Sequence, residues 1–76
     1  MDRTEYLNRM NRACYALAHD NISIGPKDTV EYQGVRYFPY EYTMGCDGEG
    51  GYNHYAVLHD LKASSVIRVP LEQVKE

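Results

Sequence analysis

Residues 29–44 read TVEYQGVRYFPYEYTM, and this stretch decides the fold because large and polar side chains alternate along it. Alternation with a period of two is typical of a strand that buries one face. Gln33-Gly34 interrupts the pattern with a short turn, which predicts a hairpin. Pro39 has no backbone N–H to donate, so it predicts a bend or an edge position in the returning strand.

The residues before this stretch predict an amphipathic helix over residues 2–19. Asp2 and Glu5 have the spacing of a capping pair, and Glu5 and Arg9 are a favourable ion pair one turn apart. Asp20-Asn21 is expected to end the helix. Apolar residues recur every three or four positions, which places them on one stripe. The predicted stripe consists of Tyr6, Leu7, Met10, Ala13, Cys14, Leu17 and Ala18.

The residues after it predict two more strands and a short terminal turn. A glycine-rich connection over 45–51 leads to a strand at 52–59, and a polar turn at 60–64 leads to a second strand at 65–69. The sequence VLHDL (57–61) followed by VIRVPLEQV (66–74) resembles the close of SH3-like barrels, in which a last hairpin runs into a one-turn helix. This resemblance bears on fold class and implies no activity.

The chain therefore predicts one α+β domain over residues 1–76, a size that leaves a small core. We expect the helix at about 2–19 to pack on a β region at about 28–70, followed by a short turn at 71–75. The sheet is expected to be small, antiparallel and bent, or an SH3-like barrel, with four to five strands.

The charge distribution gives the best indication of function. Seven acidic and two basic residues lie between Asp20 and Asp60, whereas both ends of the chain are slightly basic. The chain has eight tyrosines and no tryptophan. An acidic surface that carries phenol rings repels nucleic acid and suits a basic protein partner. A phosphate-contacting stripe of Arg3, Arg9 and Arg12 is the weaker interpretation, because the whole chain is acidic.

The partner-binding residues follow from this charge and from the strand alternation. Tyr52 and Tyr55 lie on opposite faces of one predicted strand, so one of them is expected to be exposed and to anchor an arginine-rich partner. The other strand tyrosines, Tyr32, Tyr37, Tyr40 and Tyr42, are expected to be core or half-core. The predicted binding residues are Glu41, Asp47, Glu49 and Asp60 as charge contacts, with Tyr52 and Tyr55 as anchors.

Metal and catalytic chemistry are weakly indicated. Cys14, His19, Cys46, His54 and His59 are soft ligands, but no C-x2-C pair is present and His54 and His59 are expected on opposite strand faces. Cys14 fits the apolar stripe of the helix as a buried thiol. If a zinc site exists, Cys46 and His54 are its expected members. No cofactor is expected, and no motif names a reaction, so the chain is predicted not to be an enzyme.

In size, charge and lack of a catalytic motif the chain resembles small inhibitors from phages and mobile elements, including anti-CRISPR proteins. The resemblance implies a non-catalytic acidic protein that mimics nucleic acid and blocks a basic nucleic-acid-handling partner. The alternatives are an SH3-like accessory module that mediates protein contacts and a zinc-stabilised domain. The sequence shows no secretion signal and no membrane-spanning segment, so we expect a cytoplasmic location and no membrane partner. We expect no direct nucleic-acid partner. The oligomeric state is expected to be a monomer or a homodimer.

Overall fold

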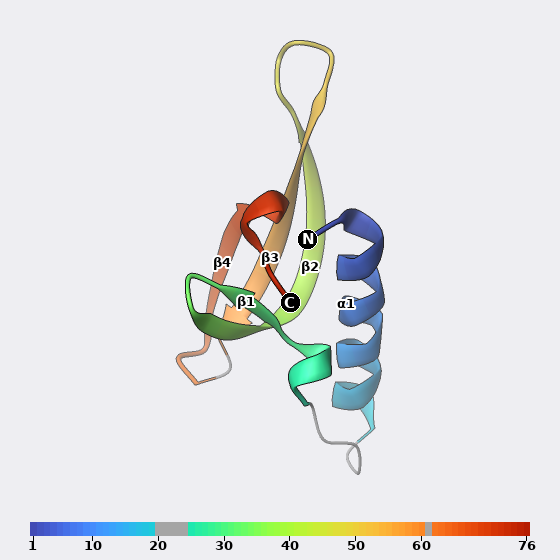
Figure 1. The fold of residues 1–76 in the computed structure, drawn as a ribbon, viewed down its shortest axis with the longest axis vertical. Coiled ribbons are helices and arrows are strands. Elements are labelled where there is room, and N and C mark those ends of the chain that lie inside the picture. The colour runs from blue at the N-terminus through green and yellow to red at the C-terminus, as the bar shows by residue number, and fades with distance from the viewer. Residues whose placement is uncertain (20–24, 61) are drawn as a thin grey trace.

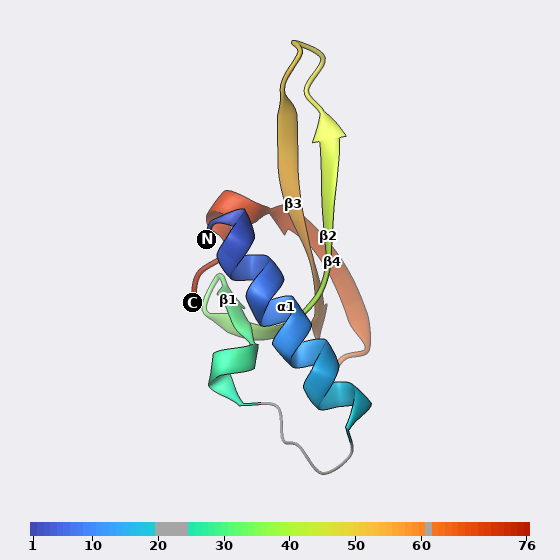
Figure 2. The ribbon, with the colours of Figure 1, turned by 90° about the vertical axis from the view of Figure 1, so that its right-hand side faces the viewer.

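The computed structural model describes residues 1–19, 25–60 and 62–76, which form one helix and one curled antiparallel sheet. The strands lie in the order β1-β2-β3-β4, and α1 runs alongside β2 (Figure 1, Figure 2). The predicted α+β fold with a small bent sheet is confirmed, with four strands. The elements are α1 (Arg3–Ala18), η1 (Pro26–Asp28), β1 (Val30–Tyr32), β2 (Val35–Cys46), β3 (Tyr52–Asp60), β4 (Ser65–Pro70) and η2 (Leu71–Gln73), where η1 and η2 are single 3-10 turns.

The start of α1 follows the local sequence. The Glu5 amide donates to Asp2 Oδ1 at 2.9 Å, so Asp2 caps the helix. Arg9 Nε donates to Glu5 Oε1 at 2.9 Å, one helical turn away. The predicted cap and ion pair are confirmed, and the helix bounds agree to within one residue. The prediction that Asp20-Asn21 ends the helix lies outside the described residues.

The buried face of α1 is narrower than the apolar stripe suggested. Tyr6, Ala13 and Ala16 are buried, whereas Cys14 is exposed and Leu17 is 60% exposed. The prediction of a buried Cys14 was therefore wrong. The helix contacts the body mainly along β2, and a single line of contact leaves residues at the margin of the stripe in solvent.

The turn at Gln33-Gly34 forms as predicted. Both residues have positive φ, 52° and 80°, which is the geometry of a two-residue hairpin turn that matches the twist of its strands. The register pairs Tyr32 with Val35 directly across it. Glycine adopts this conformation without steric cost at position 34.

Pro39 bends β2 without ending it. Pro39 pairs with Leu58, and Glu41 pairs with the next residue of β3, Val57, so Tyr40 is an extra residue at a β-bulge. The predicted bend is confirmed. The bulge also turns Tyr40 outward, where it is 53% exposed, so the prediction of Tyr40 as a core residue was wrong. Tyr32, Tyr37 and Tyr42 are partly buried and pack against the core, as predicted.

The core gathers residues from the helix, the sheet and the C-terminal turn around one buried phenol. Tyr6 is fully buried, and its hydroxyl lies 2.8 Å from Glu41 O and 3.2 Å from Val57 O. The hydroxyl donates to these carbonyls beside the bulge. Burial raises the pKa of Tyr6, because the charged phenolate would lose its hydration. The other core residues are Val30, Ala56, Leu58, Val69, Leu71 and Val74.

The C-terminal tail returns to β1 and brings the two margins of the sheet together. The Glu31 amide donates to Lys75 O at 2.8 Å, and the Lys75 amide donates to Glu31 O at 2.9 Å. The Met1 amine donates to Val74 O at 2.7 Å, so the first residue lies against the same tail. Pairing with the tail protects the outer edge of β1.

Replacing Tyr6 with phenylalanine tests whether its hydroxyl stabilises the bulge. Tyr6→Phe removes the donor that two carbonyls share, and we expect a loss of about 1–2 kcal/mol in the free energy of unfolding, measured by urea denaturation. Tyr15→Phe is the matched control, because Tyr15 is 58% exposed and its loss should change little. Equal stabilities of the two variants would contradict a structural role for the Tyr6 hydroxyl.

Candidate partner-binding surface

The hairpin of β2 and β3 projects well beyond the body of the molecule (Figure 1, Figure 2). β1 pairs with β2 only up to Tyr37, and β4 pairs with β3 only from Tyr55 onward. The residues beyond the Thr43–Tyr55 pair, 44–54, therefore form a two-stranded ribbon, which we call the arm. The arm contributes to the elongated shape of the molecule, whose extents are 46 × 22 × 19 Å.

The tip of the arm is a turn organised by one carboxylate. Asp47 Oδ1 accepts from the amides of Glu49 at 2.7 Å and Gly51 at 3.0 Å. The Asp47 amide in turn donates to Gly51 O at 3.2 Å. Gly48 and Gly50 both have φ of 85°, a conformation that favours glycine. The glycine-rich connection expected at 45–51 is thus the end of β2 followed by a hydrogen-bonded turn.

The four predicted acidic contacts do not form one cluster. Asp47 and Glu49 lie together at the tip, and Glu41 is exposed on β2 nearer the body. Asp60 ends β3 at its opposite end, eight residues from Tyr52, which is roughly 25 Å along a strand. Its Oδ1 accepts from the amides of Lys62 at 3.0 Å and Ala63 at 3.3 Å, so it caps the next turn.

Beyond Arg36, near the start of β2, the hairpin nevertheless contains no lysine or arginine. This segment runs from Tyr37 to Leu61 in the sequence. The same segment contains five of the eight tyrosines, at positions 37, 40, 42, 52 and 55. The arm itself carries two acids, Asp47 and Glu49, and the exposed Tyr52, whereas all eight lysines and arginines lie outside it in the sequence.

The two predicted aromatic anchors differ in accessibility. Tyr52 lies on the arm opposite Cys46 and is 63% exposed. Tyr55 is half-buried, and the Arg68 guanidinium lies 3.9 Å from its ring centroid. Tyr52 is thus available to a partner, whereas Arg68 covers one face of Tyr55. Met44, which is 52% exposed, adds an apolar side chain to the arm and was not predicted as a contact.

A cluster of polar aromatic groups lies at the root of the arm. The Tyr42 hydroxyl is hydrogen bonded to His54 Nδ1, and the two rings stack with centroids 5.9 Å apart. The Arg3 guanidinium lies 5.5 Å from the Tyr42 ring centroid, within the range of a cation–π contact. These contacts join the start of α1 to both strands of the hairpin. Sequence spacing did not indicate them, because the strand register decides which side chains meet.

A hollow of about 530 Å³ opens beside this root. It lies where the start of α1, the first residues of β3 and the turn η2 meet. Its volume is in the range of ligand-binding pockets. No local sequence pattern indicated this hollow, because its walls come from three distant segments. The lining residues are Met1, Asp2, Arg3, Tyr52, Asn53, His54, Tyr55, Pro70, Leu71 and Glu72.

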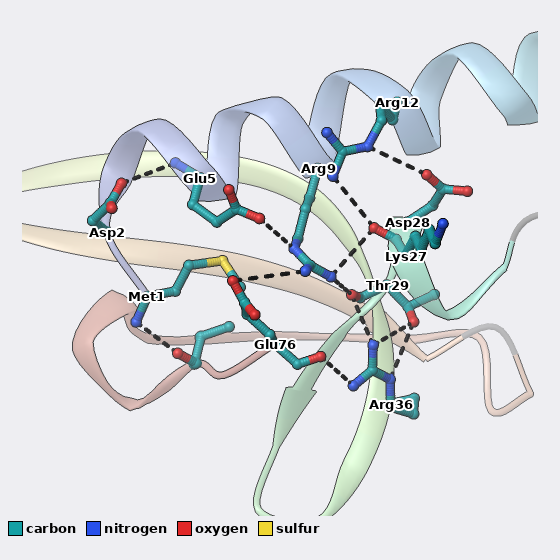
Figure 3. Close-up of polar contacts among 11 residues, drawn as sticks. Met1, Asp2, Glu5, Arg9, Arg12, Lys27, Asp28, Thr29, Arg36 and Glu76 are labelled. Atoms are coloured by element: carbon teal, nitrogen blue, oxygen red, sulfur yellow. Dashed lines mark hydrogen bonds and ion pairs between the residues drawn. The ribbon is translucent and has the colours of Figure 1, made fainter.

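Arg9 and Arg12 of α1 contact the segment that leads into β1 (Figure 3). Arg9 bonds Glu5 and also donates to Lys27 O at 3.2 Å and Thr29 O at 2.9 Å. Arg12 lies 3.6 Å from an Asp28 oxygen. Arg9 is only 11% exposed, so a phosphate-contacting stripe on this helix would have to break these contacts.

The expected zinc ligands lie on the arm. Cys46 and His54 are on its two adjacent strands, and Cys46 is a free thiol. No three histidine, cysteine, aspartate or glutamate side chains within residues 1–19, 25–60 and 62–76 are grouped closely enough to hold a metal. His54 Nδ1 is hydrogen bonded to the Tyr42 hydroxyl on the other strand of the hairpin.

Comparisons with protein-family models, with curated proteins and with solved structures found no match. In the part of the chain that the structure describes, no helix is long and apolar enough to cross a membrane. Any functional assignment therefore depends on the geometry of the arm and the hollow.

The tip turn should depend on the Asp47 carboxylate oxygen and not on its charge. Asp47→Ala removes the acceptor of two amides, so we expect hydrogen exchange at Glu49 and Gly51 to become roughly tenfold faster by NMR. Asp47→Asn keeps a side-chain oxygen and should leave both rates close to those of the wild type. Unchanged exchange in Asp47→Ala would show that the turn forms without this carboxylate.

Proposed function

We propose that this protein is a non-catalytic binding protein that inserts its acidic arm into a basic groove of a larger partner. The observation that carries the proposal is the arm itself, a projecting ribbon with acids at its tip and with no lysine or arginine in the sequence from residue 37 to residue 61. Complementary charge steers such an encounter and rejects partners of the wrong sign. A narrow ribbon can enter a groove that a globular surface could only cover.

The partner class that fits best is a nucleic-acid-handling protein. Its basic groove is built to receive phosphates and stacked bases. Asp47 and Glu49 would take the place of phosphates, and the exposed Tyr52 ring would occupy a position where a base stacks. The protein would then act as an inhibitor, because the arm and the nucleic acid compete for one groove. This is the mode of action implied by its likeness to the small phage and mobile-element inhibitors.

An accessory module is the second candidate, and the hollow beside η2 favours it. A partner that docks there through apolar contacts alone would bind equally well at low and high salt. Self-association through the free strand edges of the arm is a further outcome that the same measurements detect.

The proposal is tested by pull-down with identification of the captured protein. Asp47→Asn/Glu49→Gln removes two charges at the tip, and the amide at position 47 preserves the turn. We expect this variant to bind the partner about tenfold more weakly at low salt. The wild-type complex should weaken as salt rises, because exposed charges are screened over about 10 Å at 0.1 M. Added duplex DNA should displace the wild-type protein from its partner.

The matched control is Glu31→Gln/Asp60→Asn, which removes two charges away from the arm. It should bind like the wild type, since neither residue lies on the arm. A partner that binds the tip variant as tightly as the wild type, at low and at high salt, and that DNA does not displace, would contradict the proposal. Such a result would favour the accessory module.

A further inference from the structure

The hollow lies against a strand edge that no part of the described chain pairs with. β4 follows β3 only as far as the Tyr55–Pro70 pair. Pro70 has no N–H to continue the ladder, and the chain leaves the sheet into η2, where Leu71 is buried. Residues 52–54 of β3 therefore pair with β2 on one side only, and all three line the hollow on the other side.

The backbone of such an edge is suited to binding an extended peptide. Alternate residues of a singly paired strand direct N–H and C=O groups away from their neighbour, and an extended peptide can bond to them. A segment bound here would continue the sheet in the line of β4. A volume of about 530 Å³ leaves room for its side chains.

Two acidic side chains line the hollow. Asp2, at the start of α1, and Glu72, in η2, are both exposed. Neither forms an ion pair with another described residue; Asp2 Oδ1 accepts only the Glu5 amide. The exposed Tyr52 also lines the hollow, and an aromatic ring can bind a cation on its face.

The two positive groups in the lining are directed elsewhere. The Arg3 guanidinium lies over the Tyr42 ring, and the Met1 amine donates to Val74 O and Leu71 O. We propose that the hollow binds an extended segment of the partner that adds as a strand to residues 52–54 and carries an arginine or lysine between Asp2, Glu72 and Tyr52. The inference rests on the proposed function, because it assumes a basic partner, and it assigns the partner a second contact at the root of the arm, away from the acidic tip.

A peptide titration monitored by NMR tests this groove without the partner. The probe is a short acetylated and amidated peptide of alternating valine and arginine. We expect saturable shifts at the amides of residues 52–55 and 71–72, and no comparable shifts along α1 beyond its first turn. A peptide with the same side chains but with N-methylated backbone amides should bind at least roughly tenfold more weakly, because it lacks the donors that pair with a strand edge.

The charge contribution is tested with Asp2→Asn/Glu72→Gln. Asparagine is a good N-cap, so the helix start is preserved. We expect this variant to bind the arginine peptide roughly fivefold more weakly, as the loss of two exposed charge contacts predicts. A peptide in which glutamine replaces arginine should bind the variant and the wild type equally.

Failure of this inference is distinguishable from failure of the proposed function. Absence of shifts at millimolar peptide, or equal binding of the N-methylated peptide, would overturn strand addition even if the arm captures a DNA-displaceable partner. Equal binding of the arginine and glutamine peptides by the wild type would overturn the selection for positive charge. Peptide binding at residues 52–55, together with a partner whose affinity does not change in the tip variant, would support strand addition and refute binding through the acidic tip.

Discussion

The fold depends on the placement of one phenol hydroxyl beside a break in strand register. The extra residue at the Pro39 bend disturbs the ladder between β2 and β3, and Tyr6 donates to the carbonyls of Glu41 and Val57 at that point. Tyr6 is fully buried and its bond to Val57 O is buried, so that carbonyl would lose a hydrogen bond inside the core without this donor. This contact fixes α1 against the sheet and sets where the hairpin leaves the body.

The root of the arm is supported by contacts with the body. A two-stranded ribbon is marginally stable alone, so its root needs support from the body. The start of α1 supplies Arg3 against Tyr42, and β4 supplies Arg68 against Tyr55 on the other side of the hairpin. The tip is held independently by the Asp47 carboxylate. The arm is thus braced at both ends, and its acidic and aromatic side chains remain exposed.

Local signals in the sequence predicted the elements, and non-local contacts decided the rest. The Asp2 cap and the Gln33-Gly34 turn depend on neighbouring residues, and the structure confirms both. The exposure of Cys14 depends on how narrowly α1 contacts the sheet. The exposure of Tyr40 depends on the bulge, which arises from the pairing of β2 with β3. The hollow could not be predicted, because its walls meet only after the tail and the first residues fold onto β3.

We propose that the partner binds the arm and not the helix or the body. Hydrogen exchange with mass spectrometry, on the free protein and on its complex with the captured partner, would locate the bound surface. We expect new protection over residues 44–54, with α1 unchanged. Protection confined to α1 or to β1, with the arm exchanging as in the free protein, would contradict this proposal.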